Sequence, residues 1–169
     1  MHNIYLIGMM GAGKTATGKA LARLAKIKFL DLDEEIESRN HLSINEIFQK
    51  KGEPFFRAEE KRILSEAAGQ SGTVVATGGG IVLNPENIEK MRATGRMIYL
   101  AASFNSLWER VQGKKDRPLL SVPDPQAVFY RLFQARRPLY EASCQGRVET
   151  EGLTPEGIAK KIFEQYLRS

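Results

Sequence analysis

Residues Gly8 to Thr15 read Gly-Met-Met-Gly-Ala-Gly-Lys-Thr and satisfy the pattern G-x-x-x-x-G-K-[ST]. Glycines there let backbone N–H groups approach a phosphate, the lysine reaches the terminal phosphates, and the threonine hydroxyl binds magnesium. An apolar run before Gly8 and helical spacing after Lys14 supply the flanking strand and helix, which disfavours a chance glycine turn. The sequence therefore predicts a nucleotide-phosphate loop formed by Gly11, Ala12, Gly13, Lys14, Thr15 and Ala16.

Two aspartates are candidates for metal binding and for acid–base chemistry. In many ATPases the acid on the metal side closes a buried strand, but neither Val74–Thr77 nor Met97–Ala102 ends in aspartate. Asp31 and Asp33 instead follow a short apolar run, and alternation in an extended segment would put both carboxylates on one side. One can then serve magnesium through water while the other serves a hydroxyl group. The alternative, that Asp33 only caps the following helix, stays open.

Glycines and arginines elsewhere are candidates for contact with a second ligand. The run from Gly78 to Gly80 directly follows an apolar segment, where it commonly contacts a ligand, although a plain tight turn is the alternative. A planar guanidinium binds carboxylate or phosphate through paired N–H donors, which makes Arg57, Arg117 and Arg136 candidates. Taken singly, each arginine is more often a solvated or structural residue.

The remaining sequence alternates between short apolar runs and segments with helical spacing. This alternation predicts a three-layer α/β fold in which helices cover both faces of a five-stranded parallel sheet. The expected strands are Ile4–Gly8, Lys28–Leu30, Thr73–Ala76, Arg96–Leu100 and Arg147–Glu149. We expect residues 1–169 to form one domain.

Two segments interrupt this regular alternation. Residues 32–70 are too long for one crossover helix and predict two or three, with a capping box at Ser43 and Glu46 and a break at Gly52. This helical region lies between the second and third strands, where it could form a substrate-binding lobe. Residues 113–124 contain two prolines and a charge cluster, which indicates a mobile surface loop able to act as a lid.

Composition disfavours several classes of protein. The net charge is +5, but the basic residues are interleaved with 20 acidic ones, which favours an enzyme with anionic substrates over a nucleic-acid-binding protein. No apolar run approaches the roughly 20 residues that cross a bilayer, and the start of the chain lacks a signal-peptide pattern. Cys144 is the single cysteine, so no internal disulfide can form. We therefore expect a cytoplasmic protein without a membrane or nucleic-acid partner.

Taken together, these motifs resemble those of the shikimate kinase family, which has the fold of P-loop nucleoside monophosphate kinases. The likeness covers almost the whole chain, from GMMGAGKT through FLDLDEEIE, SINEIF, GEPFFRAEE and VVATGGG to DRPLL and RRPLYE. One departure is Asn40-His41, where a glycine is expected in many relatives, and it affects only a local turn. The resemblance implies a monomeric enzyme that uses ATP and magnesium to phosphorylate shikimate.

On the nucleotide side, the resemblance implies a phosphate and magnesium site formed by Gly11, Gly13, Lys14 and Thr15. Asp31 would lie near the metal through water. Arg110 would stack on the adenine ring, and residues 150–155 would form the other side of the adenine pocket. Arg117 would swing in with the lid and neutralise charge on the transferred phosphoryl group.

On the acceptor side, the resemblance implies that Asp33 hydrogen-bonds the shikimate hydroxyls and acts as the base for the attacking 3-hydroxyl. Arg57 and Arg136 would bind the carboxylate. Together with Lys14 and Arg117, Asp33 would carry out the catalysis. Backbone groups would contact the same ring from Gly78, Gly79 and Gly80.

Two alternatives stay open from the sequence. A gluconate kinase-like enzyme would share the fold, the phosphate loop and a polyol acid as acceptor, although the TGGG, FFR and RPLL motifs favour shikimate. A nucleotide-dependent switch would turn over no small molecule, but the chain has no N-K-x-D motif for guanine recognition.

Overall fold

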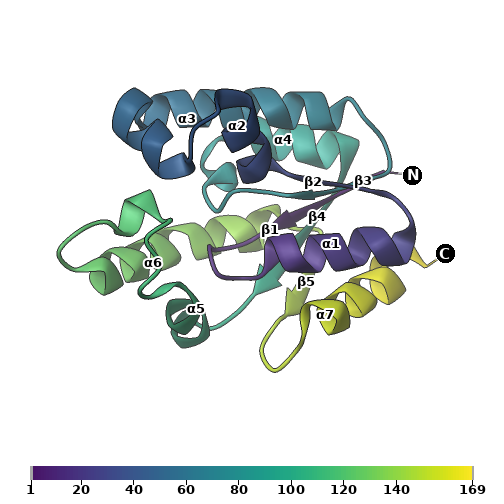
Figure 1. Cartoon of the computed structure of the whole chain (residues 1–169). Helices are drawn as coiled ribbons and strands as arrows, with labels where there is room; N and C mark the ends of the chain where they lie inside the picture. Colours follow the sequence, from purple (N-terminus) through teal and green to yellow (C-terminus); the bar gives the residue numbers. More distant parts are fainter. Residues whose placement is uncertain (1, 169) are drawn as a thin grey trace.

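The computed structural model describes residues 2–168 of the chain. Its strands form one parallel sheet in the order β2-β3-β1-β4-β5 (Figure 1). The strands are β1 (Asn3–Ile7), β2 (Lys28–Asp31), β3 (Thr73–Ala76), β4 (Gly95–Ala101) and β5 (Gly146–Glu149). All five predicted strands are confirmed, and their ends differ from the prediction by no more than one residue.

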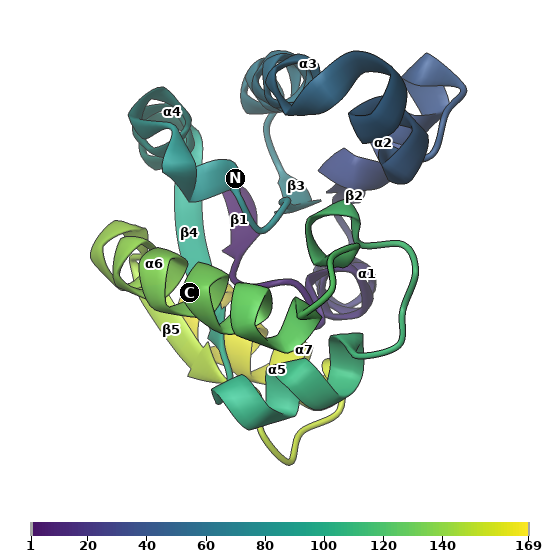
Figure 2. The same ribbon diagram turned by 90° about the vertical axis from the view of Figure 1, so that its left-hand side faces the viewer.

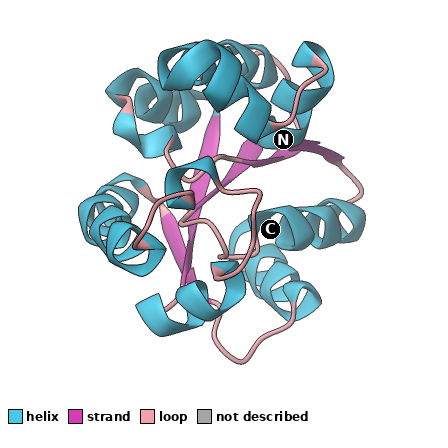
Figure 3. Cartoon of the chain, turned by 60° about the vertical axis from the view of Figure 1, so that its left-hand side comes forward, coloured by secondary structure: helices cyan, strands magenta, loops and turns pink. Residues whose placement is uncertain are grey.

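Helices cover both faces of the sheet, which confirms the three-layer α/β fold (Figures 2 and 3). On one face α1 packs against α7, and on the other α4 and α6 pack against β4 (Figure 2). The helices are α1 (Lys14–Ala25), α2 (Leu32–Asn40), α3 (Ile44–Ala68), α4 (Pro85–Thr94), α5 (Phe104–Val111), α6 (Pro125–Ser143) and α7 (Pro155–Ile162). Shorter helical turns are η1 (Ile81–Leu83), η2 (Pro118–Leu120) and η3 (Phe163–Leu167). None of the helices in the described part of the chain combines the length and apolar character that a membrane crossing needs.

The central strand β1 is buried along its whole length. Its apolar residues run without alternation because helices cover a parallel sheet on both faces. β1 pairs with β3 in a register that aligns Leu6 with Ala76, so both strands end at the same edge. The phosphate loop follows β1 at this edge, and the run Gly78–Gly80 follows β3 beside it. The sheet therefore brings together two motifs that lie far apart in the sequence.

The helical insertion between β2 and β3 consists of α2 and α3. Ser43 opens α3 with the predicted capping box: its N–H donates to the Glu46 carboxylate at 2.8 Å, and the Glu46 N–H donates to its hydroxyl at 3.2 Å. Gly52 has φ 83° and ψ 166°, so the predicted break lies inside α3 and divides it into two helical segments. The prediction of two or three helices is confirmed.

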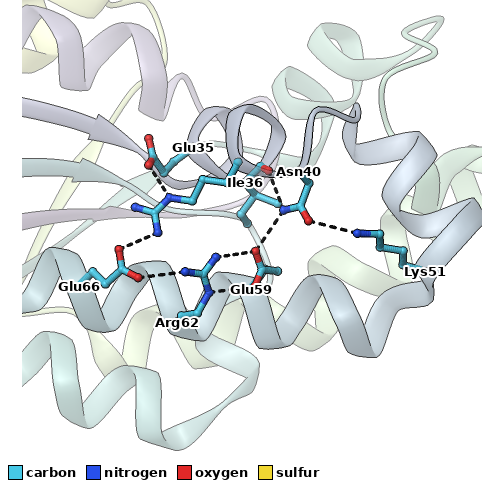
Figure 4. Close-up of polar contacts among 8 residues, drawn as sticks. Glu35, Ile36, Asn40, Lys51, Glu59, Arg62 and Glu66 are labelled. Atoms are coloured by element: carbon cyan, nitrogen blue, oxygen red, sulfur yellow. Dashed lines mark hydrogen bonds and ion pairs between the residues drawn. The ribbon is translucent and has the colours of Figure 1, made fainter.

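Polar side chains hold α2 against α3 (Figure 4). The Asn40 amide donates to the Glu59 carboxylate at 3.1 Å, and Arg39 pairs with Glu66 at 2.7 Å. Arg62 then joins Glu59 and Glu66 along α3. These side chains are mostly part-exposed, so a single ion pair contributes little to the stability of the fold. The connected set nevertheless spans both helices. The insertion is therefore held together as one unit.

His41 ends α2 in the left-handed conformation, with φ 53° and ψ 33°. It belongs to the pair Asn40-His41, where the resemblance led us to expect a glycine. A side chain in this conformation costs about 1 kcal/mol relative to glycine. We expect His41→Gly to raise the free energy of unfolding by about 0.5–1 kcal/mol, measured by urea denaturation. Ser38→Gly is the matched control, because Ser38 is exposed inside α2 and glycine there should destabilise by about 0.5 kcal/mol. A similar loss of stability in both variants would contradict the prediction.

Candidate active site

The phosphate loop has the backbone conformation that its glycines predict. Gly11 and Gly13 both have φ 85°, which glycine adopts without strain. A Cβ atom at residue 11 would also lie 2.8 Å from Val111 Cγ1, so close packing excludes a side chain there. Gly13 is the N-cap of α1, and no side chain caps the N–H groups of the first turn. These N–H groups and the helix dipole are therefore available to an anion.

A large open cavity lies over this loop and encloses about 1310 Å³, including the part open to solvent. The predicted nucleotide residues that line it are Gly11, Gly13, Lys14, Thr15, Ala16, Asp31, Arg110 and Arg117. Ala12 does not line it, since its side chain is buried and its N–H donates to the Met9 carbonyl at 3.1 Å. Arg110 donates to the Gly11 carbonyl at 3.0 Å and so lies against the loop. Residues 150–155 are not part of the cavity lining among the described residues, and their adenine contact stays a prediction.

Thr15 and Asp31 form a pair that suits magnesium. The Thr15 hydroxyl donates to Asp31 Oδ2 at 2.5 Å. Magnesium keeps several waters and is commonly bound by one or two protein oxygens together with substrate phosphates. Within residues 2–168 no group of three or more His, Cys, Asp or Glu side chains suited to a metal occurs, so the pair can supply only part of the octahedral oxygen shell of magnesium. The pair therefore fits a magnesium ion that is bound together with a nucleotide.

Asp33 lies in the first turn of α2, and the cap of that helix is Asp31, whose Oδ1 accepts the N–H groups of Asp33 and Glu34. The alternative that Asp33 is the cap is therefore wrong. The expectation that both aspartates belong to one extended segment is also wrong, because the chain becomes helical directly after Asp31. Asp33 Oδ1 is buried without a hydrogen-bond partner in the described residues. Burial, with the nearby charges of Asp31 and Glu60, raises the pKa of Asp33 to about 7, so this carboxylate can take up a proton near neutral pH.

Lys14 lies close to Asp33 on the nucleotide side. Its Nζ donates to the carbonyl oxygens of Gly8 and Met9 at 2.8 and 2.9 Å. Burial lowers the pKa of Lys14 to about 8, although the charge of Asp33 opposes this shift. Two strongly shifted pKa values in one cleft are typical of a functional site. A bound phosphate would favour the charged lysine and compensate for its burial.

A second, smaller cleft adjoins the nucleotide cavity and holds about 530 Å³ of space, including the part open to solvent. The residues that line both are Met10, Asp33, Ile44, Gly79, Asp116 and Arg117. Gly78–Gly80 form one side of the second cleft, and α3 forms another. Phe48 and Phe56, with ring centroids 5.0 Å apart, give it an apolar surface. Phe56 thus belongs both to the core and to the cleft lining.

The second cleft is lined by three arginines and three acidic side chains: Arg57, Arg117, Arg136, Asp33, Glu60 and Asp116. Arg57 pairs with Glu60 at 3.0 Å and with the more exposed Glu53 at 3.2 Å. Arg136 is only 3% exposed and forms no ion pair within the described residues. Burial raises the pKa of Glu60, although the neighbouring arginines oppose this shift. The buried Arg136 guanidinium thus has no ion-pair partner among the described residues, and an anionic ligand would supply one.

Glu60 was not predicted from the sequence as a cleft residue. Its signal is the spacing of Arg57 and Glu60 at i and i+3, which places both on one face of a helix. The same spacing joins Glu59 to the exposed Arg62, so it does not distinguish a surface pair from a cleft pair. Met10 and Phe48 were missed for a similar reason, because apolar side chains in a cleft look like core residues in the sequence.

The predicted lid, residues 113–124, contains the turn η2 and contacts α3. Arg117 precedes this turn as its N-cap and lines both cavities; its Nε is buried without a hydrogen bond among the described residues and lies 3.9 Å from Asp116 Oδ1. The Asn45 amide of α3 donates to the Lys115 carbonyl of the lid at 2.6 Å. The lid therefore lies over the junction of the two cavities in this structure.

These cavities meet where Asp33 and Arg117 lie, so a phosphoryl group on the phosphate loop is within reach of an acceptor in the arginine-lined cleft. The fold and the site together define the class: a P-loop kinase that acts on a small acidic molecule.

Comparison with known proteins identifies the family. The family model "Shikimate kinase" matches residues 10–167. A shikimate kinase from Thermodesulfovibrio yellowstonii is 43% identical over an alignment of 170 positions, which covers 99% of this chain and 96% of that protein. One from Pseudomonas entomophila is 41% identical and covers 98% of this chain and 96% of its own. The chain belongs to the shikimate kinase family and is a phosphotransferase.

Solved structures agree with this assignment. The shikimate kinase from Acinetobacter baumannii in complex with shikimate has a TM-score of 0.95 and 38% identity, and the match covers 99% of this chain and 93% of that chain. A gluconokinase from Sinorhizobium meliloti covers 95% of this chain and 88% of its own with a TM-score of 0.56 and 16% identity, which shows a shared fold alone. The family assignment therefore favours neither the gluconate kinase-like alternative nor the nucleotide switch.

Asp33→Asn should stabilise the ligand-free protein in a pH-dependent way. The folded protein keeps Asp33 protonated up to about pH 7, whereas an unfolded chain releases this proton near pH 4. The wild type therefore loses stability relative to Asp33→Asn as the pH rises between these values. We expect the melting temperature of the variant to exceed that of the wild type by about 5 °C at pH 8 and by less at pH 5, measured by calorimetry without metal or nucleotide.

Glu34→Gln is the control for this prediction, because it removes an exposed negative charge from the same turn of α2. Its melting temperature should stay close to that of the wild type at both pH values. A difference between Asp33→Asn and wild type that is equal at pH 5 and pH 8 would contradict the assigned burial of the charge.

Proposed function

We propose that the chain transfers the γ-phosphoryl group of ATP to the 3-hydroxyl of shikimate and forms shikimate 3-phosphate and ADP. The observation that carries this proposal is the junction of the two cavities at Asp33 and Arg117, in a cleft that also holds the buried and unpaired Arg136. The Acinetobacter baumannii relative, whose structure is a complex with shikimate, supports the choice of acceptor.

The acceptor cleft matches the chemistry of shikimate, a six-membered ring with one carboxylate and several hydroxyls. Arg57 and Arg136 bind the carboxylate, because a guanidinium can donate two parallel N–H bonds to it. The backbone groups of Gly78, Gly79 and Gly80 contact the polar edge of the ring. Its apolar face packs on the aromatic pair of the cleft.

The nucleotide cavity binds ATP through the phosphate loop. Backbone N–H groups between Gly11 and Ala16 bind the phosphates together with the side chain of Lys14. Thr15 and Asp31 hold one magnesium ion, Asp31 through water, and this ion supplies neutralising charge to the phosphates when bound. Arg110 lies beside the loop, where it can stack on the adenine ring, with residues 150–155 on the other side.

Catalysis requires an acceptor of the hydroxyl proton and donors to the transferred group. Asp33 takes the proton of the 3-hydroxyl while its oxygen attacks phosphorus in line. Lys14 and Arg117 stabilise the negative charge on the transferred phosphoryl group. The lid excludes water, which would otherwise compete as acceptor. Because one chain supplies all residues of both cavities, we propose a monomeric enzyme.

The first test is ADP release from purified protein with ATP and magnesium, compared for shikimate, gluconate and no acceptor. We expect shikimate alone to stimulate release strongly, because only its ring and carboxylate fit the cleft together. Lys14→Ala is the control for a contaminating kinase and should release ADP at the background rate. Equal release with and without shikimate would contradict the proposed acceptor.

Arg117→Ala should lower kcat by about 100-fold to 1000-fold, because it removes a donor to the charge that develops during transfer. Lys115→Ala is the matched control, since it also removes one positive charge from the lid but lies exposed. Its kcat should stay near that of the wild type in the same steady-state assay. An equal effect of the two substitutions would mean that lid charge in general, and not the placement of Arg117, supports catalysis.

A further inference from the structure

Gly79 and Gly80 are the central residues of a β-turn that is closed by the Ile81 N–H donating to the Gly78 carbonyl at 3.2 Å. Gly80 has φ −95° and ψ 6°, the values expected for the third residue of a type I turn. Glycine there would equally accept the φ of about +80° of a type II turn, in which the central peptide is rotated by about half a turn. The sequence of the turn therefore permits two orientations of the Gly79–Gly80 peptide.

Tyr140 contacts this peptide from the buried side. Its side chain is fully buried in α6, and its hydroxyl donates to the Gly79 carbonyl. A rotated peptide would turn this carbonyl away and leave the hydroxyl with the thioether of Met9, 3.6 Å away, which is a weak acceptor. Loss of a buried hydrogen bond is costly, so the Tyr140 hydroxyl favours the type I orientation.

The orientation of this peptide decides where the Gly80 N–H points. In a trans peptide the N–H lies opposite the carbonyl, so the Gly80 N–H points away from Tyr140. Gly79 and Gly80 line the acceptor cleft, whereas Tyr140 does not. No backbone acceptor in residues 2–168 takes this N–H. A Cβ atom at residue 80 would lie 2.5 Å from Arg57 Nη1, so Gly80 lies beside the guanidinium that is proposed to bind the carboxylate.

We propose that Tyr140 is a positioning residue whose hydroxyl holds the Gly79–Gly80 peptide so that the Gly80 N–H faces the acceptor beside Arg57. This inference deepens the proposed function and rests on it for the identity of the acceptor. Arg136 and Tyr140 are four residues apart on α6, so one helix face supplies both a cleft cation and the anchor of the glycine turn. Stacking on Tyr99, with ring centroids 5.2 Å apart, holds the Tyr140 ring in place.

Tyr140→Phe tests this role because it keeps the ring and its stacking but removes the hydroxyl. We expect KM for shikimate to rise by about tenfold, while kcat and KM for ATP stay within about twofold. Tyr99→Phe is the matched control, since it removes a hydroxyl from the stacked neighbour and leaves the anchor intact, and all three constants should stay near the wild-type values. An unchanged KM for shikimate, or an equal rise in both KM values, would overturn the proposal.

Amide NMR of the ligand-free protein tests the peptide orientation independently of the acceptor. In Tyr140→Phe the Gly79 and Gly80 amides should show exchange broadening on the microsecond-to-millisecond scale or move to new positions, while in Tyr99→Phe they should match the wild type. Unchanged turn amides in Tyr140→Phe would overturn the proposal, even if shikimate failed to stimulate the wild type and the proposed function itself were lost.

A measurement on the wild type decides the question if Tyr140→Phe does not fold. Shikimate that accepts the Gly80 N–H should polarise the peptide and strengthen the hydrogen bond at the Gly79 carbonyl. In protein labelled at tyrosine Cζ and glycine nitrogen, shikimate should therefore shift the Tyr140 and Gly80 signals together. A shift of Gly80 without any response of Tyr140 would overturn the proposal.

Discussion

The site depends on the hydrogen bonds that end the pairing of β1 and β3. The Thr77 N–H and hydroxyl both donate to the Leu6 carbonyl, at 3.2 and 2.9 Å, so the parallel ladder continues one residue beyond β3. Past this point the two strands separate: β1 continues into the phosphate loop, and β3 continues into the glycine turn. They stay in contact, since a Cβ atom at Gly79 would lie 3.4 Å from the Met10 nitrogen. The nucleotide cavity and the acceptor cleft therefore adjoin as a direct consequence of strand order.

At this edge the fold holds charges that it does not fully neutralise. The pKa of Lys14 falls to about 8 and that of Asp33 rises to about 7, both because burial disfavours the charged form. Arg136 is buried without an ion pair in the described residues. A core that covers both faces of the sheet supplies the stability that tolerates such charges, and a phosphate and a carboxylate would supply the missing partners. Unfavourable burial in the free protein thus becomes preorganisation for two anionic ligands.

The sequence predicted what depends on local chemistry. Glycines, hydrophobic periodicity and a capping box act within a few residues, so the strands, the phosphate loop and the opening of α3 at Ser43 could be predicted correctly. Asp33 was predicted near the site for a partly wrong reason, because the side chain of Asp31 caps α2 and starts the helix earlier than alternation suggested. The roles of Glu60 and Tyr140 could not be predicted from the sequence, because they depend on contacts between distant segments: α3 with the cleft, and α6 with the turn after β3.

The gluconokinase comparison shows that the same sheet and helices occur at 16% identity, so the fold alone does not determine the acceptor. In this chain Asp33 and Arg57 come from the insertion and Arg117 comes from the lid, all outside the sheet that carries the phosphate loop. These segments are not constrained by strand pairing as the β1–β3 edge is, although their buried side chains join the same core. The glycine turn differs, since it continues directly from a strand and is held from the core by Tyr140. In the proposed complex the turn would give the acceptor a fixed backbone contact next to the phosphate loop, and the charges of the insertion and the lid would orient the reacting hydroxyl.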